Sequence, residues 1–286
     1  MLKYLQLTKP SIMLLVIITG AASLAVQGSL THHPLASLLI LLGLGLTGGS
    51  ANAFNMYFER DIDAQMSRTR NRRPLPKGEL KPVFALAFAI AIGIFGIAIF
   101  IAFFNILSAV MALATIIYYA LFYTLVLKPH TVHNIVIGGA AGAMGPVIAW
   151  AASSGSLAIQ PILLFLIIFL WSPPHFWALA IYLKKDYELV KYPMLPVVKG
   201  EKSTKNQIVA YTILLILSSG FLVSLGGGVI YLAAVLIGGG ILFSKAMVLK
   251  KSAAGQAARK YFGISIIYLF ALFMSLIADN LLKITF

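Results

Sequence analysis

The residues from Asn55 to Gly78 read NMYFERDIDAQMSRTRNRRPLPKG and follow directly on an apolar run of membrane length. Charged groups are costly next to hydrocarbon, so a dense cluster of acidic and basic side chains at this place indicates a functional site. Asn55, Glu59 and Asp63 lie four residues apart, a spacing that puts one amide and two carboxylates on one face of a helix. The stretch therefore predicts a helix that carries oxygen ligands to the surface of a membrane.

Two kinds of ligand chemistry meet in this stretch. Carboxylate and amide oxygens suit Mg²⁺, which takes one or two carboxylates together with substrate phosphates. The arginines between positions 68 and 73 can bind phosphate oxygens through paired N–H groups. Because the surroundings are apolar, we infer a ligand that has a diphosphate at one end and a lipid at the other. A mixed-charge loop that only fixes the topology is the alternative, and the four-residue period and a second charged loop later in the chain disfavour it.

The composition is that of a polytopic membrane protein. The chain has 286 residues, of which 60% are hydrophobic and 10% charged, and its mean hydropathy is +0.94. A soluble domain of this size cannot bury so much apolar surface. The chain has no cysteine, which excludes disulfides, thiolate chemistry and metal sites built on sulfur.

The apolar runs predict nine membrane spans, each close to the ~20 residues that a helix needs to cross a bilayer. We expect these spans at about 11–28, 35–55, 83–104, 106–127, 134–152, 161–183, 207–224, 226–247 and 263–282.

The net charge of +14 follows the predicted topology. All of the 22 lysines and arginines except Lys283 fall on the side that the nine spans give to the N-terminus. The positive-inside rule makes that side cytoplasmic and places the C-terminus outside. Because topology explains the basic charge, we expect no nucleic-acid partner.

A second stretch with polar side chains reads WSPPHFWALAIYLKKDYELVKYPMLPVVKG, from residue 171 to residue 200. The pair Pro173-Pro174 predicts a kink in the sixth span. Next to this kink, His175 lies in sequence between Trp171 and Trp177, a combination that suits a large planar ligand. A hydrogen bond from His175 to a neighbouring helix is the alternative.

These motifs, in this order, resemble the UbiA superfamily of intramembrane prenyltransferases and, within it, the family of protohaem IX farnesyltransferases. The superfamily pattern is similar to Asn55, Glu59 and Asp63 followed by the basic run to Pro74. The narrower family pattern is similar to NIVIGG (134–139) with AGA (141–143), to WSPPHFWALA (171–180), and to DY with PMLPVVKG (186–187 and 193–200). The resemblance covers the whole chain.

The resemblance implies a role for each polar residue. Its catalytic residues would be Asn55, Glu59, Asp63 and Asp186. Its metal ligands would be Glu59, Asp63, Asp61 and Asp186, with Mg²⁺ as the cofactor. Its diphosphate ligands would be Arg68, Arg72, Arg73, Lys128 and Lys184, and its haem-binding residues would be His175, Trp171 and Trp177.

The chain departs from the family pattern at two places that matter for the site. The basic run before Pro74 holds one residue more than usual, so Arg72 and Arg73 are interchangeable candidates for the diphosphate. Val190 stands four residues after Asp186, where other superfamily members carry a second carboxylate.

The resemblance implies an all-α polytopic membrane protein, with about nine transmembrane helices in a bundle around a central cavity. Residues 1–286 would form one domain in the plasma membrane, with active-site loops at about 55–82 and 184–206 on the cytoplasmic face. The implied reaction transfers a farnesyl group from farnesyl diphosphate to a vinyl group of haem B, with a haem A synthase or the assembly of a terminal oxidase as a further partner.

Two other functions compete with this one. Another aromatic acceptor could replace haem in the same chemistry. A membrane transporter is the alternative of a different class, and it is disfavoured because transporters carry their ionisable groups near the middle of the membrane. Here these groups gather at one face.

Overall fold

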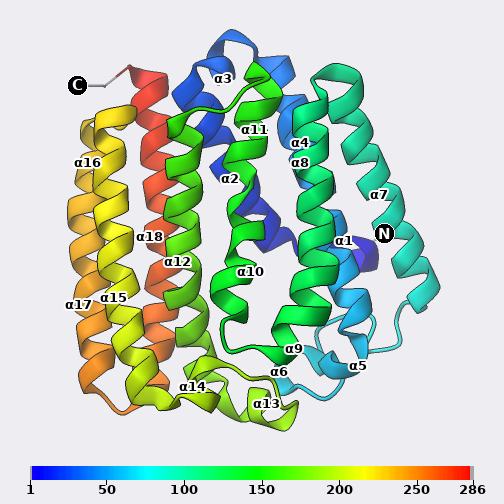
Figure 1. The fold of residues 1–286 in the computed structure, drawn as a ribbon, viewed down its shortest axis with the longest axis vertical. Helices are drawn as coiled ribbons and strands as arrows, with labels where there is room; N and C mark the ends of the chain where they lie inside the picture. The colour runs from blue at the N-terminus through cyan, green and yellow to red at the C-terminus, as the bar shows by residue number, and fades with distance from the viewer. Residues whose placement is uncertain (1, 284–286) are drawn as a thin grey trace.

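The computed structural model describes residues 2–283, and within this range the regular elements are helices, with no β-strand (Figure 1). Nine helical segments of the described range are long and apolar enough to cross a membrane, as predicted. They are α2 (Pro10–Gln27), α4 (Pro34–Phe58), α7 (Pro82–Phe103), α8–η1–α9 (Ile106–Ile117, Tyr118–Leu127, Lys128–His130), α10–α11 (Asn134–Ala143, Gly145–Ser154), α12 (Ile159–Tyr182), α15–η2 (Gly200–Phe221, Leu222–Leu225), α16–η3–α17 (Val229–Ala233, Ala234–Gly238, Gly239–Lys251) and α18 (Ala254–Leu282).

The predicted spans differ most from the observed helices at the starts of α15 and α18. The apolar pattern predicts that these spans begin near residues 207 and 263, whereas the helices begin at Gly200 and Ala254. The extra turns contain polar and charged residues, GEKSTKN and AGQAARKYF. Such turns continue a helix beyond the hydrocarbon, where an apolar window no longer detects it.

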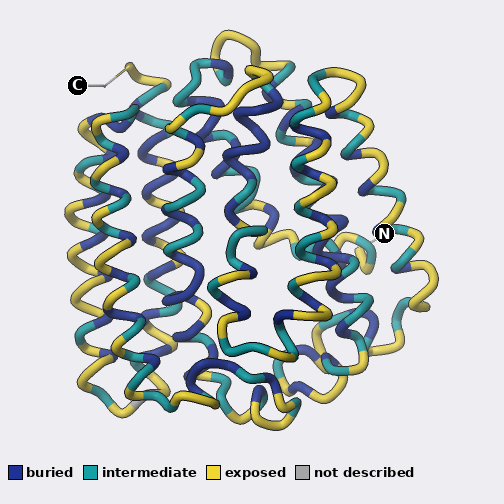
Figure 2. The backbone as a smooth tube through the Cα atoms, viewed as in Figure 1, coloured by how far each residue is buried: buried dark blue, intermediate teal, exposed yellow. Residues whose placement is uncertain are grey.

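The outer faces of the bundle are apolar. On α7, Ile94 and Phe95 are 62% and 67% exposed, and on η3 Ile237 is 67% exposed. Figure 2 shows that exposed positions recur along the outward sides of these helices, while buried positions face inward. Large exposed apolar surface of this kind fits contact with lipid.

Small residues let α4 and α7 pack closely. A Cβ atom at Gly93 would lie 2.6 Å from the Ser50 hydroxyl, and one at Gly96 would lie 3.0 Å from the backbone nitrogen of Thr47. Ser50 in turn donates a hydrogen bond to the carbonyl of Ala89 at 2.7 Å. Close approach through small residues is the usual packing of helices in membranes, where burial of apolar surface drives association weakly.

The prolines of the sixth span do not break it. Helix α12 continues through Pro173 and Pro174, and both residues are buried. Each proline lacks the N–H that a helix would use, and buried surroundings can accommodate the freed carbonyl groups.

Both charged loops lie at one end of the bundle. Their short helices are α5 (Arg60–Asp63), α6 (Ser67–Arg70), α13 (Lys184–Leu189) and α14 (Leu195–Val198), and all four lie at the bottom of Figure 1. The hydroxyl of Ser67 lies 2.8 Å from both carboxylate oxygens of Asp186, and the backbone N–H of Arg68 donates to the same carboxylate at 3.2 Å. The two loops are therefore joined directly to each other.

Candidate active site

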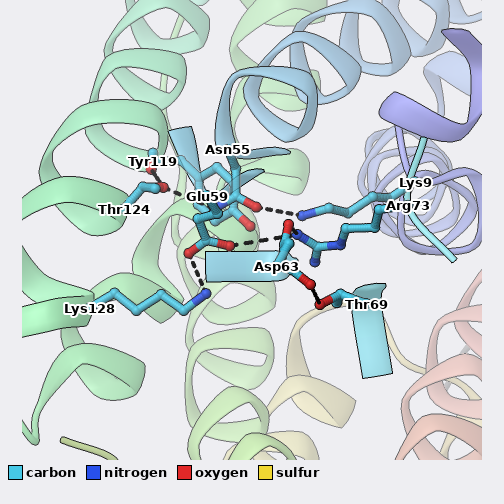
Figure 3. Close-up of polar contacts among 9 residues, drawn as sticks. All are labelled: Lys9, Asn55, Glu59, Asp63, Thr69, Arg73, Tyr119, Thr124 and Lys128. Carbon is cyan, nitrogen blue, oxygen red and sulfur yellow. Dashed lines mark hydrogen bonds and ion pairs between the residues drawn. The ribbon is translucent and has the colours of Figure 1, made fainter. Parts of the chain in front are cut away.

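Three oxygen-bearing residues form a ladder of the kind that the spacing predicts: Asn55 near the end of α4, Glu59 at its C-cap and Asp63 at the end of α5. The Glu59 amide donates to the Asn55 carbonyl at 3.0 Å, and the Asp63 amide donates to the Glu59 carbonyl at 2.8 Å, so helical bonding continues across the junction. The three side chains point into the same space (Figure 3). All three residues are at most 3% exposed. The chain thus holds one amide and two carboxylates together away from solvent.

Three cationic side chains from distant parts of the sequence surround this ladder. Lys128 forms an ion pair with Glu59. Arg73 forms an ion pair with Asp63, and its Nη1 atom lies 3.7 Å from Oε2 of Glu59. Lys9 donates a hydrogen bond from Nζ to Oδ1 of Asn55 at 2.8 Å. Figure 3 shows the cations converging on the carboxylates from two sides.

The two carboxylates differ in their electrostatics. Burial raises the pKa of Glu59, but the charges of Lys128, Arg73 and Lys9 outweigh burial and bring this pKa below its ordinary value. Burial also raises the pKa of Asp63, and there the Arg73 charge only partly offsets it, so this pKa lies above its ordinary value. Glu59 is therefore the more firmly ionised of the two groups.

Lys9 is a residue of the site that the sequence interpretation missed. Burial and the neighbouring charge of Arg73 bring the pKa of Lys9 well below its ordinary value. Its backbone is left-handed, with φ at 53°, a conformation that residues with a Cβ atom seldom adopt outside functional or strained positions. The available signal was a lysine directly before Pro10, the residue that opens the first span.

The segment η1 has π-helical geometry and supports the ladder from the side. Asn55 donates from Nδ2 to the Thr124 hydroxyl at 3.0 Å, and Thr124 donates to the carbonyl of Tyr119, five residues earlier, at 2.8 Å. Turns of this kind are frequent at functional sites. Lys128 follows directly after η1, and its Nζ atom lies 5.1 Å from the ring centre of Tyr192 in the second loop.

The structure separates the remaining basic candidates. Arg73 contacts the carboxylates, whereas Arg72 is exposed. The two arginines, which are interchangeable candidates in the sequence, therefore differ in their contact with the ladder. Arg68 is part-buried, and its Nε atom is buried without a hydrogen-bond partner in the described residues. Lys184 forms its own ion pair with Glu188 at 3.7 Å.

The acidic candidates do not all come together. The Asp61 side chain is 81% exposed and pairs with Arg60 at 3.6 Å. Asp186 contacts Ser67 and Arg68 as described above. Among residues 2–283, no group of three or more Asp, Glu, His and Cys side chains is close enough to hold a metal ion.

The ladder fits Mg²⁺ by its donor chemistry. Glu59 and Asp63 supply the one or two carboxylates that Mg²⁺ takes from a protein, and water and substrate phosphates supply its other ligands. The Arg73 guanidinium already pairs with both carboxylates, so these oxygens are arranged to share one cation.

The predicted haem-binding residues lie on α12 and face two different neighbours. The His175 ring stacks between Trp171 and Phe262, with centroids 4.2 Å and 4.3 Å away, and its Nδ1 atom is 2.8 Å from the Ser265 hydroxyl on α18. Trp177 contacts Tyr211 of α15 instead, at 5.2 Å between ring centroids. These contacts fit helix packing, and the haem role of the three residues stays a prediction.

Comparison with known proteins identifies the family. The profile of the UbiA prenyltransferase family matches residues 14–277. A protein of Symbiobacterium thermophilum named protoheme IX farnesyltransferase is 44% identical over 279 residues, which cover 96% of this chain and 93% of that protein. A protein of the same name from Erythrobacter litoralis is 45% identical, with 98% of this chain and 92% of that protein covered.

Solved structures share the fold at low sequence identity. A structure of digeranylgeranylglyceryl phosphate synthase has a TM-score of 0.78 at 20% identity and covers 97% of both chains. A UbiA homologue from Archaeoglobus fulgidus, bound to GPP and Mg²⁺, has a TM-score of 0.64 at 14% identity, with 96% of this chain and 99% of that chain covered. The profile match spans nearly the whole described bundle, and the chain belongs to the UbiA prenyltransferase family.

Proposed function

We propose that the chain transfers the farnesyl group of farnesyl diphosphate to a vinyl group of haem B. Addition of water completes the reaction, and the products are haem O and diphosphate. The observation that carries this proposal is the identity of 44–45% over nearly the full length to proteins named protoheme IX farnesyltransferase. The site supports it, because a buried cluster of acidic and basic groups suits a diphosphate at the end of an apolar chain.

The cations of the cluster would bind the diphosphate. Arg73, Lys128 and Lys9 already lie within one group of contacts, and together they exceed the two carboxylates by one positive charge when all five groups are ionised. Arg68 has a buried Nε–H without a partner in the described range, and phosphate oxygens would satisfy it. Positioned donors of this kind stabilise negative charge on a leaving group.

Glu59 and Asp63 would hold Mg²⁺, with Asn55 beside them. When bound, this ion would act as a Lewis acid toward the diphosphate oxygens. Asp186 would act as a second acidic group at the same end of the bundle, positioned by the Ser67 hydroxyl. Burial of the ladder excludes bulk water, which protects an allylic cation until its acceptor reacts.

The acceptor would lie farther into the membrane, near residues 171–177 of α12. Ser265 engages Nδ1 of His175, and within residues 2–283 the Nε2 atom has no hydrogen-bond partner. Fixing one ring nitrogen in this way orients the other toward a ligand, as in many metal-binding histidines. The acceptor and diphosphate subsites would then be separate.

The first prediction concerns the reaction itself. Bacterial cells that express the chain and lack their own activity of this kind should accumulate haem O, which extraction and mass measurement detect as haem B plus a farnesyl group and a hydroxyl group. Cells that carry the empty vector are the control. Haem B alone, with the protein present in the membrane, would contradict the proposal, and a prenylated quinone precursor would assign another acceptor.

The second prediction separates the two aspartates of the first loop. Asp63→Ala should lower turnover at least about 100-fold, since positioned charge of this kind contributes factors of 10² to 10³. Asp61→Ala, at an exposed position two residues away, should keep turnover within a factor of about three. Turnover is measured on both purified variants at saturating Mg²⁺, and chelation of Mg²⁺ should reproduce the Asp63 defect in the parent protein. Equal activities of the two variants would disprove the assignment.

The third prediction tests His175. His175→Ala should weaken haem B binding or change the haem absorption spectrum, while the affinity for farnesyl diphosphate stays within a factor of two. Ser265→Ala, which removes the Nδ1 partner, should reproduce part of the spectral change. If haem titration gives the same result for His175→Ala as for the parent protein, His175 does not bind haem and serves only the packing of α12 against α18.

The fourth prediction concerns orientation in the plasma membrane. We propose that the charged loops face the cytoplasm, because the basic residues gather there. The chain has no cysteine, so single substitutions can be labelled without background. A cysteine at Asn71 should react only with reagent on the cytoplasmic side, and one at Ser156 only from outside. The reverse pattern would place the active site on the other face.

A further inference from the structure

A separate, open surface cavity is lined by residues of α17 and α18. These two helices join at the end of the bundle where the charged loops gather (Figure 1). The volume of the cavity is about 450 Å³. Three exposed cationic residues border it, together with the exposed Gln256, and its wall is mainly aliphatic; the cations are Lys245, Arg259 and Lys260. Ile264 and Ile267 form its apolar part. None of these residues belongs to the ladder site or contacts it.

The positive charge of this cavity has no acidic partner nearby. The sequence contains no Asp or Glu between Glu201 and Asp279. Asp279 lies near the opposite end of α18, where it accepts hydrogen bonds from backbone N–H groups at the start of α16. Within residues 2–283, none of the three cations forms an ion pair, and Arg259 only lies 5.7 Å from the ring centre of Tyr182.

The position of the cations along the helices fits the surface of a membrane. Lys245 lies in the last two turns of α17, and Arg259 and Lys260 lie in the first two turns of α18. Ile267 follows two turns deeper and is 63% exposed on the lipid-facing side. The cavity therefore has a cationic end at the membrane surface and an apolar end in the hydrocarbon.

We propose that this cavity binds the headgroup phosphate of an anionic phospholipid, with its acyl chains along Ile264 and Ile267. Lysines at helix ends often extend to the membrane surface without binding a ligand. Here three cationic residues border one open hollow. In the proposed orientation this end of the bundle faces the cytoplasm, where basic pockets between transmembrane helices suit anionic headgroups. A soluble phosphate would match only the cationic end and leave the apolar end unused, which is why the lipid is the occupant that fits.

Native mass spectrometry of the full chain, released from mixed lipid, tests the proposal. The parent protein should retain one phosphatidylglycerol in preference to phosphatidylcholine. Each cation near an anionic headgroup strengthens binding roughly fivefold, so the double variant Lys245→Gln/Lys260→Gln should bind roughly thirtyfold more weakly. The matched control is Lys250→Gln/Lys251→Gln, which removes the same charge from exposed positions outside the cavity. Equal losses of phosphatidylglycerol binding in both double variants would indicate a non-specific attraction between basic residues and anionic lipid, and would overturn the proposed site.

A second variant tests the cavity without changing its charge. A Cβ atom at Gly263 would meet no other atom within 4 Å, so the side chain of Gly263→Leu has open space in the cavity and favours the helix. This variant should fold, keep haem O formation, and lose the retained phosphatidylglycerol. Undiminished lipid binding in Gly263→Leu would overturn the proposal, as would displacement of the lipid by haem B or by soluble glycerol phosphate at equal concentration.

Discussion

The ion pair of Arg73 with Asp63, shared with Glu59, is the interaction on which the rest of this site depends. Two buried carboxylates beside hydrocarbon carry a large desolvation cost, and they persist only with paired charge and hydrogen bonds. Ion pairs bring two distant segments to the carboxylates, the first charged loop through Arg73 and the residue after η1 through Lys128. Lys9, directly before α2, joins them by a hydrogen bond to Asn55. The local fold of the active-site end therefore follows from charge neutralisation.

The pairing of carboxylates with cations also determines which ligands the site can bind. Arg73 and Lys128 occupy the carboxylate oxygens of Asp63 and Glu59. In the proposed function, Mg²⁺ by itself would therefore have to displace both cations and leave them without partners. A diphosphate supplies these cations with new acceptors. Mg²⁺ and the diphosphate should therefore bind cooperatively. By thermodynamic linkage, each ligand should raise the affinity for the other by the same factor.

Sequence patterns predicted the number of membrane spans and the position of the ladder. They did not predict which residues of distant segments contact each other. Membrane length sets the nine spans, and the four-residue period of Asn55, Glu59 and Asp63 sets the ladder, because both are local properties of a helix. The roles of Lys9 and Thr124, and the difference between Arg72 and Arg73, depend on which distant segments meet, and no local period contains that information. The starts of α15 at Gly200 and of α18 at Ala254 were not predicted for another reason. Their first turns are polar and lie outside the apolar windows that indicate a membrane span.

Calorimetric titration of Mg²⁺ into the purified protein, with and without farnesyl diphosphate, tests the central claim most directly. Mg²⁺ should bind at least about tenfold more tightly when the diphosphate is present, a coupling within the usual range. Arg73→Gln should bind Mg²⁺ alone more tightly than the parent protein, because its carboxylates are released, and Arg72→Gln should not. Equal Mg²⁺ affinity with and without the diphosphate, together with no difference between the two arginine variants, would show that the ion pairs of Arg73 do not control metal binding.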